Sequence, residues 1–186
     1  MRLFVAVPVR DSIKQYARMI RNELGEARAD VKWVEYENYH LTLKFLGEVK
    51  ESLLPVIIKN LALAADTSPA FHLSAGGLGF FPNRMRPRVI WMGIKGEIEK
   101  AEFLGERVDA YLSDLGFEEE KNHRFHLTLG RLRSDSRLPE LLKSVAEMGG
   151  KEKLRSFKVE NFYLMNSSLT PNGPVYSILH TFSLGG

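Results

Sequence analysis

Cysteine is absent from the 186-residue chain. Its absence excludes disulfide bonds, thiolate catalysis and the zinc sites that use cysteine ligands. Long apolar runs are also missing: one of the longest covers only residues 3–9, whereas a membrane-spanning helix needs roughly 20 residues. The first residues include no basic leader followed by a long apolar stretch, so we expect no signal peptide. These absences favour a cytoplasmic protein without a membrane segment.

The chain has little excess charge of either sign, since it contains 26 lysines and arginines and 23 aspartates and glutamates. The resulting formal charge of +3 suits a phosphate-bearing partner without requiring one. With 44% hydrophobic residues, a chain of this length can bury a substantial core. We therefore expect a single domain spanning residues 1–186.

The string His-Leu-Thr-Leu occurs twice, at residues 40–43 and 126–129. With five histidines and five threonines in the chain, a His-x-Thr string is expected only about 0.13 times by chance. In an extended strand, successive side chains point to opposite faces, so each copy separates its leucines from its polar residues. The repeat therefore predicts two strands, each with a buried leucine face and a face carrying His40 and Thr42 or His126 and Thr128.

Hydrophobic periodicity divides the rest of the chain into helices and strands. Helical spacing predicts helices over residues 11–25, 52–65, 97–115 and 138–148, with Asp11 and Ser52 as candidate N-caps. Alternating or β-branched segments predict seven strands in addition to the second motif strand. They lie at residues 2–9, 32–35, 40–46 (which contains the first motif), 71–75, 89–94, 157–164 and 175–184. We expect Gly47 to end the first motif strand and residues 76–83 to form a bulge or loop. The last two strands should pair as a hairpin across a loop at residues 166–174.

This order of elements falls into two similar halves. Each half sets helices against strands and contains one His-x-Thr strand. The pattern predicts an α+β fold with pseudo-twofold symmetry.

Two such strands facing one pocket would supply it with two imidazoles and two hydroxyl groups. An imidazole, whose unperturbed pKa is about 6.5, can act as an acid or a base near neutral pH. Displacement at phosphorus uses both roles, because one group deprotonates the nucleophile while the other protonates the leaving oxygen. The two threonines would hydrogen-bond the non-bridging oxygens. Lys44 and Arg131, close to the two motifs, would add positive charge.

The remaining histidines, His72, His123 and His180, belong to no repeat, and we assign them structural positions. A zinc site of His40, His123 and His126 is an alternative, because three histidines can hold a catalytic zinc ion. No carboxylate or other ligand pattern accompanies these three residues. We therefore expect neither a metal nor a cofactor.

Two other groups of residues stay open on sequence grounds. The alternating Arg84, Arg86 and Arg88 form either a solvated loop or a phosphate-binding segment. Four aromatic residues are either core and cleft wall or stacking partners for a nucleobase. They are Trp33, Trp91, Phe80 and Phe81.

Further stretches extend the pattern over nearly the whole chain. They comprise residues 2–8, 33–34, 44–47, 81–82, 86–91, 130–131, 168–169, 173–174 and Tyr176. Together with the two motifs, these stretches resemble the 2H phosphoesterases, and within them the RNA 2',3'-cyclic phosphodiesterases also described as 2'-5' RNA ligases. Phe125 departs from that family, which often has proline directly before the second motif histidine. We expect this difference to alter the entry into the strand and not the chemistry.

The resemblance implies a bilobal fold, with two antiparallel sheets flanked by helices and a central V-shaped cleft. It also implies that His40 is the proton donor to the leaving ribose oxygen and that His126 is the proton acceptor that activates water. A 2',3'-cyclic phosphate would then open to a 2'-phosphate without a metal ion. The implied partners are RNA with 2',3'-cyclic phosphate ends or cyclic nucleotides, and we expect a monomer.

Two alternatives to hydrolysis remain at this point. A 5'-hydroxyl that attacks the cyclic phosphate in the same site would give 2'-5' ligation. A module that binds RNA ends without turnover would also retain the cleft, although intact His and Thr in both motifs argue against it.

Overall fold

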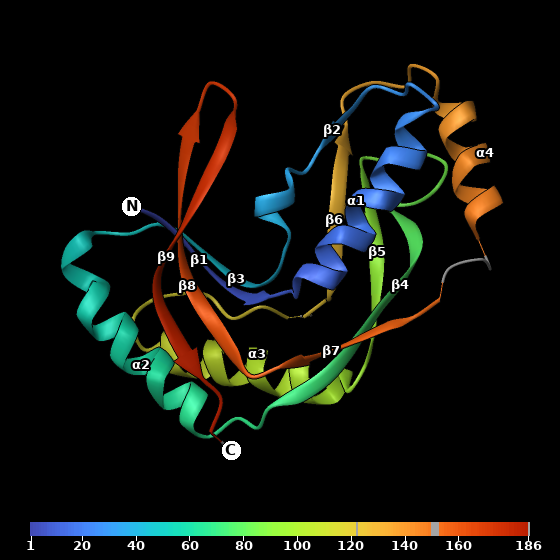
Figure 1. The fold of residues 1–186 in the computed structure, drawn as a ribbon. Helices are drawn as coiled ribbons and strands as arrows, with labels where there is room; N and C mark the ends of the chain where they lie inside the picture. The colour runs from blue at the N-terminus through green and yellow to red at the C-terminus, as the bar shows by residue number, and fades with distance from the viewer. Residues whose placement is uncertain (122, 150–152, 186) are drawn as a thin grey trace.

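Two antiparallel sheets form the framework of the computed structural model, which describes residues 1–121, 123–149 and 153–185 (Figure 1). Sheet A has the strand order β3-β1-β8-β9, and sheet B has the order β2-β6-β5-β4-β7. The strands of sheet A are β1 (Arg2–Pro8), β3 (His40–Glu48), β8 (Asn161–Thr170) and β9 (Gly173–Ser183). Those of sheet B are β2 (Val31–Trp33), β4 (Phe71–Phe81), β5 (Val89–Gly96), β6 (His126–Leu132) and β7 (Arg155–Val159).

Four α-helices lie beside these sheets (Figure 1). They are α1 (Asp11–Gly25), α2 (Leu54–Asp66), α3 (Ile98–Ser113) and α4 (Leu138–Met148), with 3₁₀ turns η1 at Tyr36–Asn38 and η2 at Glu51–Leu53. Helix α1 contacts α4, and α2 contacts α3. Of the helices in the described ranges, none has both the length and the apolar character that crossing a membrane requires.

The two halves of the chain are related as the sequence predicts. One half runs β1-α1-β2-β3-α2-β4, and the other runs β5-α3-β6-α4-β7-β8-β9. Each half contributes strands to the sheet of the other: β2 and β4 lie in sheet B, and β8 and β9 lie in sheet A. Three adjacent strands of sheet A, β3-β1-β8, therefore correspond to three adjacent strands of sheet B, β6-β5-β4. The predicted pseudo-twofold α+β fold with two antiparallel sheets is confirmed.

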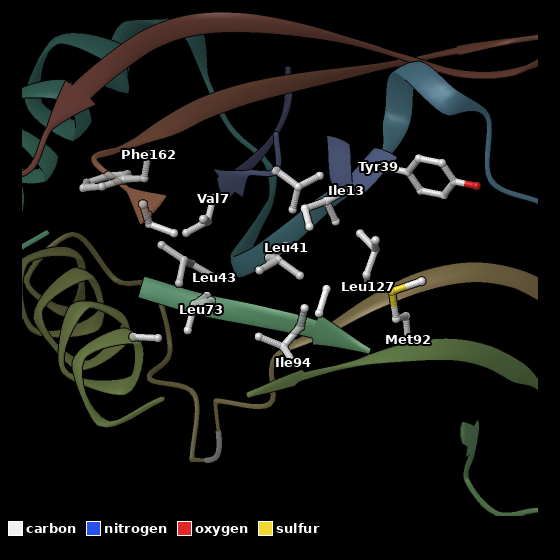
Figure 2. Close-up of a cluster of buried hydrophobic side chains, with 14 of the residues drawn as sticks. Val7, Ile13, Tyr39, Leu41, Leu43, Leu73, Met92, Ile94, Leu127 and Phe162 are labelled. Atoms are coloured by element: carbon white, nitrogen blue, oxygen red, sulfur yellow. The ribbon is translucent and has the colours of Figure 1, made fainter. Parts of the chain in front are cut away.

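The leucines of both motifs lie in one hydrophobic core between the sheets. Leu41, Leu43, Leu127 and Leu129 are all almost fully buried. Figure 2 shows the first three of these side chains pointing into the same cluster, together with Val7 of β1 and Met92 of β5. Burial of this leucine face leaves the opposite face of each motif strand to the polar residues, as the alternation predicts.

Both candidate N-caps are wrong. The carbonyl of Arg10 accepts the first bonds of α1, from the amides of Ile13 and Lys14, so Arg10 is the N-cap and Asp11 is the first helical residue. In the second helix, Ser52 lies within η2, and α2 starts only at Leu54. Pro55 accounts for this start, because a proline lacks the N–H group and is tolerated only in the first turn.

Strand boundaries also differ from those expected. Strand β3 continues through Gly47, which adopts a φ of +71° and still pairs with Leu3. The bulge expected within residues 76–83 is present between Ala75 and Leu78, but β4 continues beyond it to Phe81 and only residues 82–83 lie outside the strand. The short strand expected at residues 32–35 is Val31–Trp33.

The C-terminal segment changes sheets at Glu160, where a single strand was expected. Strand β7 pairs with β4 in sheet B, whereas β8 pairs with β1 and β9 in sheet A. The apolar alternation shifts phase here, because Phe157 and Val159 are buried before Glu160 and Phe162 and Leu164 after it, so the sequence contains a sign of the break. The expected loop at residues 166–174 is paired strand except for the turn at residues 171–172, and this hairpin projects from the molecule (Figure 1).

A buried motif leucine should stabilise the fold much more than an exposed one. We expect Leu127→Ala to lower the free energy of unfolding by about 2–5 kcal/mol, because it leaves a cavity in the shared core. The matched control is Leu63→Ala on α2, whose side chain is 41% exposed and should cost less than about 1 kcal/mol. Urea denaturation measures both values, and equal losses would contradict the burial of the motif leucines.

Candidate active site

One cavity of about 810 Å³ lies between the two motif strands. His40 and Thr42 of β3 border it, as do His126 and Thr128 of β6. The structure therefore brings together the four polar motif residues that the sequence predicts to share a pocket. Because β3 belongs to sheet A and β6 to sheet B, each sheet contributes one His and Thr pair.

Both motif strands contain a bulge at the same motif position. In β3, Thr42 pairs with Ala6 and Lys44 with Val5, so Leu43 is an extra residue in the ladder. In β6, Thr128 pairs with Trp91 and Gly130 with Ile90, which leaves Leu129 as the extra residue. A bulge re-aims the side chains that follow it. The residue after each motif is consequently buried, and the next one is exposed.

This shift explains where the two predicted cationic residues lie. Strict alternation from His40 would place Lys44 on the cavity face, but its side chain is only 3% exposed and its Nζ donates to Asp109 Oδ1 at 2.6 Å. Strict alternation from His126 would bury Arg131, yet Arg131 is exposed and borders the cavity. Lys44 also borders the cavity, and its charge is paired with Asp109, so its role in binding substrate stays a prediction.

His40 is held in one orientation by its own neighbours. Its Nδ1 lies 2.6 Å from the carbonyl oxygen of Asn38, which can only accept, so Nδ1 carries a hydrogen. Its Nε2 lies 2.9 Å from Thr42 Oγ1. Phe4 and Tyr176 pack against the ring, with centroid distances of 5.0 and 5.3 Å. These contacts leave Nε2 as the nitrogen available for proton transfer beside the Thr42 hydroxyl.

His126 is supported by stacking. Its ring lies nearly parallel to Trp91, at a centroid distance of 5.0 Å and an angle of 22°. Trp91 in turn covers Gly79, where an added Cβ would lie only 2.3 Å from the indole ring. Glycine at this position is therefore what allows Trp91 to lie flat under the imidazole. Phe81 contacts the His126 ring from a centroid distance of 5.9 Å.

Burial lowers the pKa of both imidazoles below the ordinary value. For His40, burial is the largest influence, the hydrogen bond to the Asn38 carbonyl partly opposes it by raising the pKa, and Lys14 lowers the pKa further. For His126, burial again contributes most, and the positive charge of Arg124 lowers the pKa further. Both side chains thus favour the neutral form more than a solvated histidine does.

Three arginines, Arg2, Arg124 and Arg131, border the cavity. The guanidinium group of Arg124 lies 5.6 Å from the centre of the Phe81 ring. Burial raises the pKa of Tyr176 from its usual value, while the charges of Arg131 and Arg2 act in the opposite direction. The cavity therefore has a positive environment around its two histidines, which is suited to an anionic ligand.

Sequence reasoning missed Arg2, Arg124 and Asn38. Asn38 and Arg124 each precede a motif histidine by two residues, so the alternation that selected the threonines could have selected them as well. Arg2 had no such signal, because its place depends on the pairing of β1 with β3 and β8.

Several candidate residues lie elsewhere. Arg84, Arg86 and Arg88 are exposed and are not among the residues that border the cavity. Among the aromatic candidates, Phe81 and Trp91 border it, whereas Trp33 and Phe80 pack against the hydrophobic core.

The other histidines have their own partners. His72 lies 3.6 Å from Glu97, and His180 packs on Phe182. His123 borders the cavity, but its Nε2 is hydrogen-bonded to Asp109. In the described part of the chain, no group of three or more histidine, aspartate or glutamate side chains is arranged to hold a metal ion. The zinc alternative therefore has no geometric support.

Comparison with known proteins places this geometry in a family. The family described as LigT-like phosphoesterase matches residues 5–91 and 94–176, and each segment contains one His-x-Thr motif. The chain belongs to this family. A relative from Archaeoglobus fulgidus, named RNA 2',3'-cyclic phosphodiesterase, is 42% identical over 98% of this chain and 99% of its own length. One of the same name from Thermotoga maritima is 32% identical over 100% and 97%.

Solved structures share the fold. A crystal structure from Thermus thermophilus matches with a TM-score of 0.81 and 29% identity, covering 100% of this chain and 99% of the other. E. coli LigT complexed with 3'-AMP matches with a TM-score of 0.73 and 25% identity, covering 100% and 98%.

The charge of Arg124 should be visible in the titration of His126. In this LigT-like phosphoesterase we expect both His40 and His126 to titrate below about 6.5, the value of a solvated histidine. Arg124→Gln should raise the pKa of His126 and leave that of His40 unchanged, because Arg124 influences only the former. NMR titration of the imidazole C–H resonances measures both values. An unchanged His126 pKa in the variant would show that Arg124 does not act on it.

Proposed function

We propose that this protein hydrolyses 2',3'-cyclic phosphate ends of RNA to 2'-phosphates, using His40 and His126 as acid and base. The observation that carries the proposal is the meeting of two His and Thr pairs in one arginine-bordered cavity. The names of the A. fulgidus and T. maritima relatives supply the substrate class, which the geometry alone does not specify.

In the proposed reaction, water attacks the phosphorus atom of the cyclic phosphate and loses a proton to the neutral ring of His126. The bond from phosphorus to the 3'-oxygen breaks, and protonated His40 gives its Nε2 proton to that oxygen. The products are a 2'-phosphate and a free 3'-hydroxyl. The proton that His126 gains balances the one that His40 loses, so exchange with solvent restores the enzyme.

The surroundings of the two histidines support this division of roles. The Asn38 carbonyl accepts from Nδ1 of His40 and stabilises the charged ring, which an acid requires. Arg124 disfavours a charged ring at His126, which suits a base. Burial lowers both pKa values and does not distinguish the two positions, so the assignment depends on these local partners together with the family resemblance.

Charge on the phosphoryl oxygens would be stabilised by the remaining polar groups of the cavity. Thr42 and Thr128 offer hydroxyl donors beside the two histidines, and Arg2, Arg124 and Arg131 offer positive charge. Because imidazoles fill both proton-transfer roles, this reaction needs no metal ion. The same geometry accepts a 5'-hydroxyl in place of water, and 2'-5' ligation would then follow with the two histidines in unchanged roles.

Loss of either imidazole should remove most of the activity. We expect His40→Ala and His126→Ala each to lower kcat by about 10²–10⁴-fold on an RNA with a 2',3'-cyclic phosphate end, because each removes a general acid or base. Arg84→Ala, at an exposed position outside the cavity, should retain the wild-type rate. Chromatography of the products identifies the phosphomonoester and any ligated RNA. Near-normal rates in both histidine variants would overturn the proposal, and binding without turnover by the wild type would indicate a binding module instead.

The lowered pKa values also define the pH dependence. One histidine must be protonated and the other neutral, so kcat/KM should follow a bell centred between the two pKa values of the free enzyme. Since both pKa values are lowered, the maximum should lie below about pH 6.5. Initial rates at subsaturating substrate, measured in excess EDTA, give this profile. A maximum above about pH 7 would contradict the lowered values, and loss of activity in EDTA would contradict metal independence.

A further inference from the structure

A buried cluster of charged and polar groups connects the two motif strands. Asp109 of α3, only 4% exposed, accepts through Oδ1 from Lys44 of β3 at 2.6 Å. Its other oxygen, Oδ2, accepts from His123 Nε2 at 2.8 Å and from the amide of Glu120 at 3.2 Å. The Lys44 ammonium also donates to the carbonyl of Glu118. A single carboxylate thus holds one strand of sheet A and the segment that leads into β6 of sheet B.

The cluster is close in sequence to both candidate catalytic centres. Lys44 follows Thr42 by two residues in β3, directly after the bulge that turns its side chain inward. His123 precedes His126 by three residues and Arg124 by one. A shift of Asp109 would therefore act on both sides of the cavity at once. Among the described residues, Asp109 is the one carboxylate within ion-pair distance of Lys44 and His123.

The surface of α3 is shaped to receive the His123 ring. An added Cβ at Gly105 would lie 2.8–2.9 Å from three atoms of the imidazole, so a larger residue there would push His123 away. Gly105 and Asp109 are four residues apart in α3 and share a helix face. The helix therefore provides both the space for the imidazole and the acceptor for its Nε2–H.

The energetics of such a cluster favour a geometric role. Burying an ion pair carries a large desolvation cost, so its net contribution to stability is often small compared with that of apolar residues of similar size. Its hydrogen bonds have fixed directions and lengths, however, which apolar contacts do not. Asp109 receives one donor on Oδ1 and two on Oδ2, and these three bonds fix the orientation of the carboxylate.

We propose that Asp109, through Lys44 and His123, is a positioning residue that sets the placement of His126 relative to His40 across the cavity. This inference rests on the proposed two-histidine reaction. In a reaction that depends on two groups acting on opposite sides of phosphorus, a misplacement of about 1 Å can reduce the rate by as much as 10²-fold.

The test compares two replacements of His123. His123→Gln keeps an N–H donor near the position of Nε2, whereas His123→Leu removes it at similar volume. We expect His123→Leu to lower kcat for a 2',3'-cyclic nucleotide about 10–100-fold with KM changed less than about threefold, because the groups that bind phosphate remain. His123→Gln should restore kcat to within a few-fold of the wild type. Circular dichroism and thermal unfolding first establish a temperature at which each variant is folded.

A second variant and a matched control complete the design. Asp109→Asn keeps the side-chain shape but leaves the Lys44 ammonium without a counter-charge, so it should also lower kcat. Asp30→Asn disrupts contacts with Arg133 and Ser134 beyond the other end of β6, and its kcat should remain that of the wild type. The NMR resonances of the His126 ring should shift in His123→Leu and keep their wild-type positions in His123→Gln.

The outcomes separate this inference from the proposed reaction. A folded His123→Leu variant with wild-type kcat, or equal losses of kcat in the Leu and Gln variants, would overturn the positioning role while leaving the histidine mechanism intact. Retained activity in His40→Ala and His126→Ala would instead refute the reaction itself. If His123→Leu does not fold, a wild-type kcat in folded Asp109→Asn would equally overturn the positioning role.

Discussion

The structure depends on one constraint that both motif strands satisfy. In each strand, the leucines are buried on one face while His and Thr face the cavity on the other. Leu41, Leu43, Leu127 and Leu129 occupy one core between the sheets. Because that core is shared, packing of the leucines fixes the two strands relative to each other and thereby the two polar faces. Core packing thus brings the two halves of the candidate active site together, and the proposed role of Asp109 is to refine the placement of the two histidines.

The bulge at the fourth motif residue adds the second constraint. It reverses the alternation after Leu43 and Leu129, so the next residue enters the core and the following one returns to the cavity side. In β6 the residue that enters the core is Gly130, which fits because it has no side chain; an added Cβ would lie 2.6 Å from Val31. In β3 the same position holds Lys44, whose buried charge requires Asp109. The pseudo-twofold repeat therefore contains one chemical asymmetry directly behind the site.

The sequence predicted those features of the fold and the site that depend on local patterns. Local patterns were sufficient for the helices, the two motif strands and the four polar residues, because periodicity reports which face of an element is buried. They did not indicate that Lys44 is buried against Asp109 or that Arg131 returns to the cavity side, because a bulge depends on pairing with β1 and β5. At Glu160 the apolar positions shift phase between Val159 and Phe162, which marks a break, but the sheet that each piece joins depends on its partner strands. The sequence predicts only that Asp109 lies in a helix. Its contacts with Lys44 and His123 arise from the tertiary fold.

The central claim, that two histidines act as acid and base on opposite sides of phosphorus, can be tested most directly with a modified leaving group. In a cyclic substrate that carries sulfur in place of the 3'-oxygen, the leaving thiolate needs little protonation, since a thiol is far more acidic than an alcohol. Single-turnover rates on this substrate should be near the wild-type value for His40→Ala and still strongly reduced for His126→Ala. Equal defects in the two variants, or rescue of His126→Ala alone, would contradict the assigned roles.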